Sequence, residues 1–432
     1  MGRTVWIASA LLGVGLAAAA GIGSGRVPPP ARRSEALAVV LAPQDGADVL
    51  DQQIRALQRR LSSATPAPAL LERLGWTFVA KAQASDDPGY FSLAARSAEA
   101  IDDVAPGSAA ARLLRAHALV SLHRFAEAEP IARALAAERG SPADWAILGD
   151  VTMERGRLDD AVDAYQRMVD LRPDAAAYAR IAHMRQLTGD LDGALAAIDL
   201  ATRAVSPRNP GTFAWVWTKR ASYELQRGHV AEALRAADEA LAVHPSAVGA
   251  LGVRGRALLA TGRAREAVAA LTQAAEKSPL HDVLWALAEA LRADGRPGDA
   301  DAVEARLVAR GEGTDPRGLA LFLASRGRDL ERARRLARRE LRVRRDVYTW
   351  ATLAWADAAA GDLEAARRHS ARALRHDTAD ARLEYQAGII AARAGASDEA
   401  RRLLGRAQRH AAALLPSERD ALAVHVAKEV RS

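Results

Sequence analysis

The stretch Trp145–Pro173, WAILGDVTMERGRLDDAVDAYQRMVDLRP, decides the fold of this chain. Its first half has the apolar spacing of an amphipathic helix and stops at Gly156, because a helix C-terminus favours a residue that adopts positive φ easily. Its second half carries the small Ala161 and stops at Pro173, since proline cannot continue a helix. The stretch therefore predicts two short helices joined by a tight turn, and the small Ala161 lets them approach closely.

The same pattern recurs along the chain, which is the signature of a repeat protein. The turn glycines are separated by 33, 39, 34, 33, 32, 34 and 34 residues, and they are Gly156, Gly189, Gly228, Gly262, Gly295, Gly327, Gly361 and Gly395. An alanine follows each of them in phase: Ala161, Ala194, Ala233, Ala267, Ala300, Ala333, Ala366 and Ala400. A unit of about 34 residues cannot bury its own apolar face, so neighbouring units are expected to stack.

The composition agrees with a helical protein. Half of the 432 residues are apolar, but only 4% are aromatic. Such a chain can bury enough surface to fold, and it lacks the aromatic residues that a β-rich protein favours. The most frequent residues include Ala, Leu, Arg and Glu, which are strong helix formers.

The repeat resembles the tetratricopeptide repeat family. Residues at the family's W-L-G…A…F…P positions are Trp145, Leu148, Gly149, Ala161, Tyr165 and Pro173, with further matches at Trp217, Ala221, Ala233, Ala240, Pro245, Gly255, Ala267, Leu271, Ala274 and Pro279. The resemblance covers residues 142–415, and two degenerate helix pairs, 70–104 and 109–137, precede them. It implies an all-α fold, a right-handed α-solenoid of about ten stacked helix-turn-helix repeats. Leu321, in place of a small residue, and an insertion at 206–213 depart from the pattern and are expected to change the stacking locally.

The organisation outside the array follows from composition. Residues 1–25 are predicted to be a signal peptide or N-terminal membrane anchor, because Arg3 is followed by an uncharged run, residues 4–25, long enough to tether the chain to a membrane. Residues 26–47 form a Pro-rich linker, 48–141 an N-terminal helical region with degenerate repeats, 142–415 the repeat array, and 416–432 a C-terminal tail. We expect an exported protein, periplasmic or extracellular, cleaved or tethered. The alternative is a membrane-anchored protein facing the cytoplasm, because Arg26, Arg32 and Arg33 follow the apolar run.

The sequence contains no recognisable catalytic or cofactor motif. It has no Cys, which excludes disulfides, zinc–thiolate sites and cysteine nucleophiles. No Gly is followed by Lys, so a phosphate-binding P-loop is absent, and no His pair has metalloprotease spacing. We therefore expect no enzyme, no cofactor and no metal site.

The resemblance implies that the first helices line a concave groove and that this groove holds a peptide or protein segment. The family's inward positions also include His183. The predicted partner-binding residues are Trp215, Lys219, Arg256, Trp285, Glu289, Arg292, Tyr348, Trp355 and Tyr385. Aromatic and Arg side chains concentrate binding energy at interfaces. The alternative for each aromatic residue is that it packs between helices as core.

A second candidate surface is basic. Residues 319–345 carry ten Arg against Asp329, Glu331 and Glu340, so their net charge equals the +7 of the whole chain. Arg332, Arg335, Arg339 and Arg342 are predicted to share one helix face. This face is either a binding surface for an anionic partner (lipid, glycan or nucleic acid) or a solvated helix surface in an Arg-rich chain. No aromatic residues alternate with the basic ones, so specific nucleic-acid binding is not expected.

These observations predict a non-catalytic protein–protein interaction scaffold or adaptor that uses its groove, in assembly of an envelope or secreted complex. The partner is expected to be a protein or peptide whose identity the sequence does not give. The alternative function is binding of an anionic surface through the Arg-rich helix, residues 330–345.

Overall fold

The structure is a computed structural model that describes residues 34–63, 65–85 and 87–431, with side chains to residue 428. The predicted targeting segment, residues 1–25, and the start of the predicted linker lie outside these residues. The described residues form helices and no strand. The chain divides into two compact units, residues 1–131 and 132–432, and each is described by itself.

The N-terminal unit is a small helical bundle. Its helices are α1 (Glu35–Leu41), α2 (Val49–Ser62), α3 (Pro68–Ser85), α4 (Gly89–Val104), α5 (Ala109–Ser121) and the start of α6 (Phe125–Glu138). Apolar side chains of α2, α3 and α4 form its core, among them Ile54, Phe78 and Ile101. Lys81 lies 2.7 Å from Asp48 and 2.8 Å from the buried Asp51, so a salt-bridged cluster joins α3 to the start of α2.

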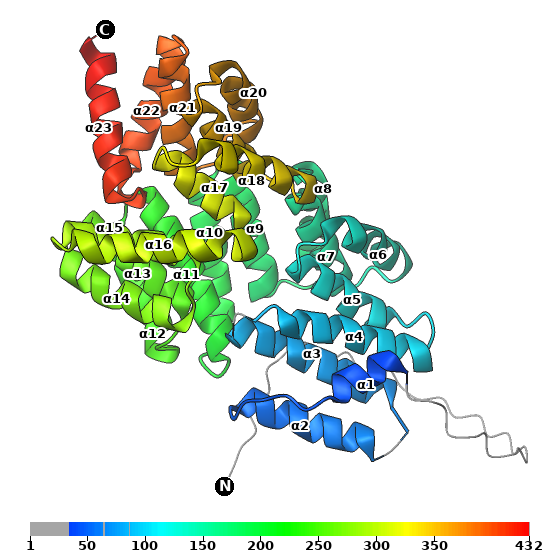
Figure 1. Cartoon of the computed structure of the whole chain (residues 1–432). Helices are drawn as coiled ribbons and strands as arrows, with labels where there is room; N and C mark the ends of the chain where they lie inside the picture. Colours follow the sequence, from blue (N-terminus) through cyan, green and yellow to red (C-terminus); the bar gives the residue numbers. More distant parts are fainter. Residues whose placement is uncertain (1–33, 64, 86, 432) are drawn as a thin grey trace, which may run out of the picture. The chain divides into compact units, whose positions relative to one another are not determined.

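The C-terminal unit contains most of the helices (Figure 1). They are α7 (Pro142–Glu154), α8 (Leu158–Leu171), α9 (Ala175–Leu187), α10 (Leu191–Ala204), α11 (Pro210–Arg227), α12 (Val230–Val243), α13 (Val248–Ala260), α14 (Ala264–Lys277), α15 (His281–Ala293), α16 (Pro297–Thr314), α17 (Pro316–Ser325), α18 (Leu330–Val343), α19 (Val347–Ala359), α20 (Leu363–Ala373), α21 (Ala381–Arg393), α22 (Ser397–Arg409), the short 3-10 helix η1 (Ala411–Ala413) and α23 (Pro416–Arg431). Among the described residues of this unit, successive helices from α7 to α22 form eight helix-turn-helix pairs, which confirms the predicted all-α solenoid. The segment 416–432, expected to be a tail, contains α23.

The turn inside each pair depends on its glycine. All eight predicted glycines have positive φ, for example 77° at Gly156. The Gly156 amide donates to the carbonyl of Met153, and the Arg157 amide donates to that of Thr152. This is the Schellman arrangement, which satisfies the last carbonyls of a helix. It recurs at each of the other seven glycines, so the repeated glycine fixes the repeated turn.

Small residues set the spacing between the two helices of a pair. Each of the eight phased alanines is completely buried. On the facing helix, a Cβ placed on Gly149 would lie 2.2 Å from Tyr165, and one on Gly255 would lie 2.4 Å from Leu271. The helices approach so closely that these positions have no room for a side chain, as the pattern predicts.

The two departures from the repeat pattern are absorbed by helix length. The insertion at 206–213 extends α11 to 18 residues, whereas α9 and α13 have 13. In the repeat that contains Leu321, α17 shortens to 10 residues and the preceding α16 lengthens to 18. The array therefore continues through both places.

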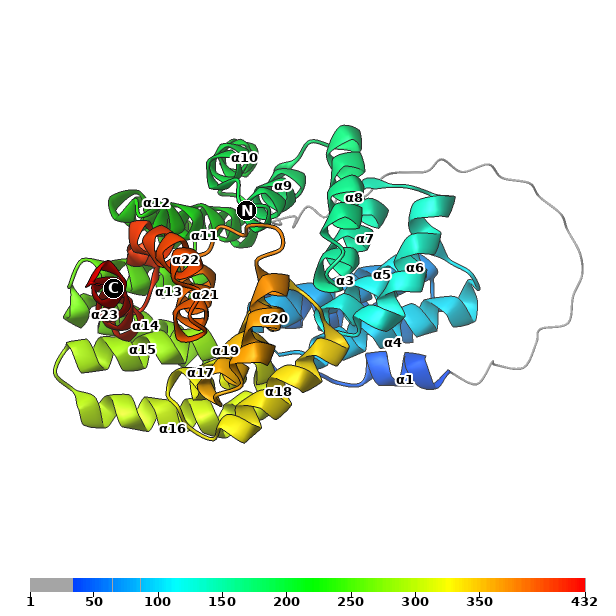
Figure 2. The same cartoon turned by 90° about the horizontal axis from the view of Figure 1, so that it is seen from above.

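The solenoid of the C-terminal unit winds so tightly that its later repeats rest on its earlier ones (Figure 2). The Ala379 amide donates to the carbonyl of Gln186 over 3.0 Å, and the Thr378 hydroxyl donates to that of Leu187 over 2.7 Å. The Arg345 amide donates likewise to the carbonyl of Glu154. The loops before α19 and α21 thus sit on the ends of α7 and α9. We call these hydrogen bonds the turn-to-turn contact.

Two neighbouring glycines of α13 provide a test of the packing. We expect Gly255→Ala to destabilise the protein by about 1–3 kcal/mol, because the new methyl group overlaps Leu271. Gly252→Ala should instead stabilise it by about 0.5–1 kcal/mol, since its Cβ would lie at an ordinary 3.7 Å from Val283 and alanine favours the helix. Urea unfolding of both variants measures the difference, and a shift of the same sign in both would contradict the packing described here.

Candidate functional site

The turn-to-turn contact defines an inner face of the solenoid. We use this term for the side of α9, α11, α13 and α15 that faces α19, α21 and the segment from η1 to α23. Gln186 of α9 donates to the Tyr348 hydroxyl over 3.2 Å, and Gln226 of α11 donates to Asp380 over 3.1 Å. Further along, Arg256 of α13 donates to the Ala413 carbonyl over 2.6 Å. The inner face is thus a set of polar side chains from first helices.

The structure places the predicted groove residues at different depths of this unit. Trp215 is 43% exposed. Trp285, Glu289 and Tyr385 are buried, at 3%, 3% and 5% exposure. The other members are partly buried: Lys219, Arg256, Arg292, Tyr348 and Trp355. The set therefore does not form one open groove, because the later repeats cover much of it.

The buried aromatic residues pack as core. The Trp285 ring meets Phe322 edge-on at 5.4 Å between centroids, and the Arg382 guanidinium lies over it at 5.0 Å. Trp355 donates its ring N–H to the Ser325 hydroxyl. Only Trp215, among the predicted groove aromatics, is exposed enough to be called a surface residue. Trp285 and Tyr385 therefore pack between helices as core residues, which was the alternative expected for each aromatic residue.

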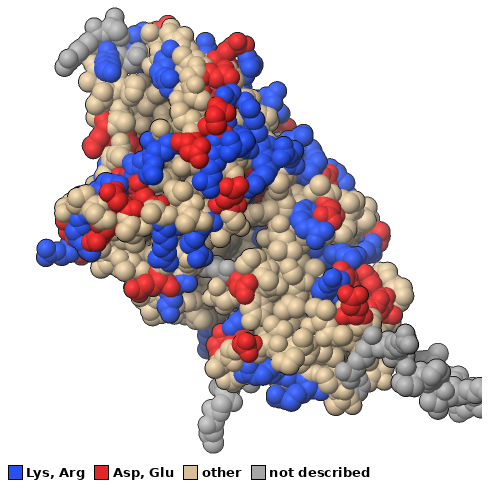
Figure 3. Space-filling model, viewed as in Figure 1, with Lys and Arg blue, Asp and Glu red and all other residues tan. Residues whose placement is uncertain are grey.

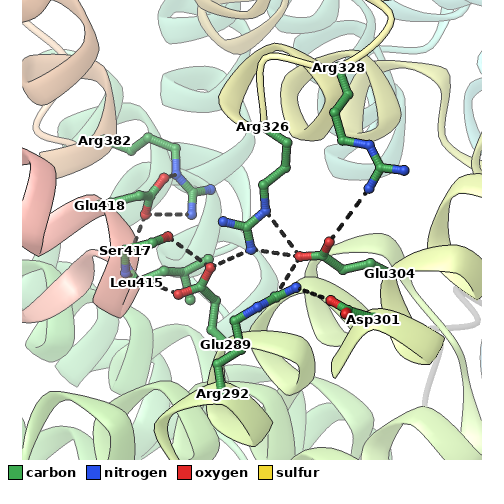
Figure 4. Close-up of polar contacts among 10 residues, drawn as sticks. All are labelled: Glu289, Arg292, Asp301, Glu304, Arg326, Arg328, Arg382, Leu415, Ser417 and Glu418. Carbon is green, nitrogen blue, oxygen red and sulfur yellow. Dashed lines mark hydrogen bonds and ion pairs between the residues drawn. The ribbon is translucent and has the colours of Figure 1, made fainter. Parts of the chain in front are cut away.

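A charge network joins α15, α16 and α17 (Figure 4). Arg326 of α17 pairs with Glu289 of α15 and with Glu304 of α16, at 2.7 Å in both cases. Arg292 pairs with Glu304 as well, at 2.7 Å, and with Asp301. The buried carboxylates of Glu289 and Glu304 are therefore neutralised by cations of their own and the next repeat. Glu289 and Arg292, predicted as ligand-binding residues, belong to this structural network.

Unlike the residues of this network, Lys219 on the inner face is not neutralised by a charge on a described neighbour. The Lys219 ammonium has no ion pair or hydrogen bond with any described residue, and burial lowers its pKa. Burial also lowers the pKa of His183 to about 3, and the nearby charge of Lys219 adds to this effect. The buried Tyr223 hydroxyl has no hydrogen-bond partner in this part of the structure. His183 of α9 therefore lies close to Lys219 of α11, and the same stretch of α11 carries the unsatisfied Tyr223 hydroxyl.

Trp215 and Lys219 are one helical turn apart on α11, so they lie on the same side of that helix. The stripe continues through Tyr223 to Gln226, which contacts the loop before α21. The stripe therefore begins at an exposed aromatic ring, continues to a partly buried ammonium, and ends where the loop before α21 covers α11. We call Trp215, Lys219 and Tyr223 the α11 stripe.

The basic face has both paired and unpaired members. Arg332 pairs with Glu312 of α16 at 2.9 Å, and Arg339 lies 3.6 Å from the same carboxylate. Arg335 and Arg342 are exposed and have no acidic partner among the described residues. Figure 3 shows Lys and Arg gathered where Figure 1 places α18. Within the described part of the chain, two of the four predicted cations are thus unpaired.

No cluster of His, Asp and Glu among the described residues could hold a metal ion. Among the same residues, no helix is both long and apolar enough to span a bilayer.

Sequence reasoning missed the residues that bind across the solenoid. Arg382 of α21 pairs with Glu418 of α23 at 2.6 Å, and Ser417 donates to Glu289. The Leu414-Leu415-Pro416-Ser417-Glu418 run was a usable signal, since Pro at a helix start followed by polar residues predicts a helix beyond the last repeat.

His183 predicts a specific pH dependence. Below pH 6.5 the unfolded chain protonates this histidine, whereas the folded chain does not until about pH 3. The unfolded state then binds more protons, so acid lowers the stability. We expect the free energy of unfolding to fall by about 1–2 kcal/mol more in the wild-type chain than in His183→Gln between pH 7.5 and pH 5. Urea unfolding at both pH values measures this, and equal losses would show that His183 is not held neutral.

A family model matches part of the repeat array. The tetratricopeptide repeat model matches residues 113–176, 148–209, 218–280 and 253–314. No curated protein matches the sequence. One similar solved structure is TTC0263, a thermophilic TPR protein of Thermus thermophilus. Its sequence is 19% identical, the match covers 45% of this chain and 100% of that chain, and the TM-score is 0.39.

Similar solved structures also include the human IFIT1 dimer with PPP-AAAA, with 16% identity, 87% of this chain and 94% of that chain covered, and a TM-score of 0.48. The same human dimer with m7Gppp-AAAA gives 13% identity, 87% and 99% coverage, and a TM-score of 0.49. The matched residues overlap the glycine-turned helix pairs of the C-terminal unit from α7 to α16. Residues 113–209 and 218–314 of this chain are thus tetratricopeptide repeats.

Proposed function

We propose that the protein is a non-catalytic scaffold that binds a protein or peptide segment along the α11 stripe. Tetratricopeptide repeats generally mediate protein–protein interactions, and proteins built from them are typically non-catalytic. One observation carries the proposal. The exposed Trp215 ring and the Lys219 ammonium, which has no ion pair with a described residue, lie one turn apart on the same side of α11.

The chemistry of the stripe suggests what the partner presents. An ammonium that is partly buried without a counter-ion has lost hydration and gained no partner, which is unfavourable. A carboxylate on the partner would restore that balance at Lys219. The Trp215 ring offers a large apolar surface for a neighbouring side chain, and Trp is enriched among residues that dominate binding energy. The fitting partner is a segment with an apolar side chain and a carboxylate about one turn apart.

The cellular setting belongs to the same proposal. We propose export through residues 1–25, by cleavage or by a membrane tether at residues 4–25, and a role in assembly of an envelope or secreted complex. Crosslinking in cells, with a C-terminal tag on the full chain, would identify the partner by mass spectrometry. Fractionation of the same cells would separate this setting from a cytoplasm-facing anchor.

A second candidate function rests on the unpaired cations of α18. Arg335 and Arg342 are exposed, seven residues apart on one helix, and lie on the same side of it. We propose this face as an anion-binding surface if the crosslinked material is lipid, glycan or nucleic acid. Two exposed cations favour attraction to a negatively charged surface rather than recognition of a specific nucleotide sequence.

The α11 stripe can be tested with the identified partner. We expect Trp215→Ala and Lys219→Met each to weaken binding about tenfold or more, because each removes a central contact. Isothermal titration or fluorescence anisotropy gives the affinity, and circular dichroism checks the helix content.

Matched controls lie elsewhere in the same unit. Leu200→Ala removes an exposed apolar side chain of α10, and Lys277→Met removes an exposed ammonium at the end of α14. Both should leave the affinity unchanged. Unchanged binding by Trp215→Ala and Lys219→Met would exclude the stripe as the binding site.

The basic face predicts a salt dependence. Binding of the full chain to vesicles with anionic headgroups should weaken steeply between about 50 mM and 200 mM salt if released counterions drive it. Replacing both Arg335 and Arg342 by Gln should reduce the affinity several-fold at low salt. The control is Arg401→Gln, which removes a cation already paired with Asp398. Equal affinity of the double variant and the control would rule out this face.

A further inference from the structure

Residues 411–422 lie on the inner face as a peptide ligand would. The segment consists of η1, the pair Leu414 and Leu415, and the start of α23. It crosses from α13 to α15 and then meets α21, which are first helices of three different repeats. The α15 residue that it contacts precedes it by 128 positions.

Charged side chains of the array hold the backbone of this segment. Arg256 of α13 donates to the Ala413 carbonyl over 2.6 Å. Glu289 of α15 accepts from the Ser417 amide over 3.0 Å and from the Ser417 hydroxyl over 2.8 Å (Figure 4). These are charge-assisted hydrogen bonds, two of them to main-chain groups, and they require no particular side chain at Ala413.

Side chains of the segment provide specificity. Leu415 is 3% exposed and packs in the core cluster that contains Trp285. Leu414 and Leu422 are equally covered and pack in the cluster that contains Tyr385. Glu418 accepts from Arg382 over 2.6 Å and 3.0 Å. Two adjacent leucines followed by a hydroxyl and a carboxylate are therefore recognised together.

Two of the array residues that hold the segment, Glu289 and Arg382, keep other charged groups nearby when it leaves. Glu289 retains its ion pair with Arg326 at 2.7 Å. Arg382 retains the attraction of Asp380, one of the charges that raise its pKa. Release of the segment would therefore leave no isolated buried charge at these two positions, which is the usual obstacle to separating a salt-bridged interface.

We propose that residues 411–422 are a built-in ligand that covers the inner face at α13 and α15 and also binds α21. A partner displaces them with a segment of the same chemistry: two adjacent leucine-sized side chains, then a helix start with a hydroxyl and a carboxylate. The inference rests on the proposed function, since it assumes that the inner face binds a partner segment. It adds the regulation of that face and the chemistry of the competitor.

The first test uses the full chain with Ser417→Ala and Glu418→Gln, which removes contacts from the segment and keeps every array residue native. Hydrogen exchange followed by mass spectrometry should show amides of residues 411–431 exchanging about tenfold faster or more. Residues 248–393 should keep their protection. Asp420→Asn is the matched control, because that carboxylate is exposed on the same helix. Unchanged exchange in 411–431, or equal acceleration throughout 248–393, would overturn the proposal.

The second test adds a labelled synthetic peptide of residues 410–431 to the full chain. We expect it to bind the double variant, whose inner face is vacated more often, with about tenfold higher affinity than the wild-type chain. A peptide with Leu414 and Leu415 replaced by Asp should bind neither. Equal affinity of the natural peptide for both chains would overturn the proposal. Neither test involves Trp215, Lys219 or the partner, so failure here is distinguishable from failure of the proposed function.

Discussion

The turn-to-turn contact is the constraint on which the C-terminal unit depends. The loop at Thr378 and Ala379 is buried against the end of α9. It is tolerated there because the Gln186 carbonyl accepts from the Ala379 amide and the Leu187 carbonyl accepts from the Thr378 hydroxyl. A Cβ on Gly156 or Gly189 would come within 2.4 Å or 2.8 Å of the carbonyls of Arg345 and Asp377. These two glycines therefore serve twice, since they shape their own turns and admit the loops of the later repeats.

This closure changes what a repeat array offers to a partner. In an open solenoid the inward side chains of all first helices are available together. Here the same side chains divide into a covered set around Glu289 and Arg382, satisfied by the chain itself, and a less covered set around Trp215 and Lys219. The Lys219 ammonium, which has no ion pair or hydrogen bond with a described residue, belongs to the second set, and this is why we assign binding to α11. The covered set is held by a segment that resembles a ligand in chemistry.

The sequence was sufficient to predict the helix-turn-helix repeat. It was insufficient to predict that the later repeats would pack on the earlier ones. Glycine turns and small residues act within one repeat, so Gly156 and Ala161 predict their own structure. The burial of Trp285 and Tyr385 depends on where residues of other repeats arrive, and that depends on small rotations summed over several repeats. A first-helix register predicts that a side chain faces inward, but it does not predict whether the interior is open. Glu289 faced inward as expected, and it binds Ser417 and Arg326 rather than solvent.

The same contact has a consequence for how the unit comes apart. In an open solenoid each repeat touches only its neighbours, so the ends fray and the stability is close to a one-dimensional sum. Here the α7 and α9 repeats are bonded to the α19 and α21 repeats, and the array becomes a closed loop of interactions. Loss of one repeat then opens a distant one, which raises the cooperativity of unfolding. The segment from η1 to α23 is the exception, because it follows the last repeat of this loop and can detach without breaking it.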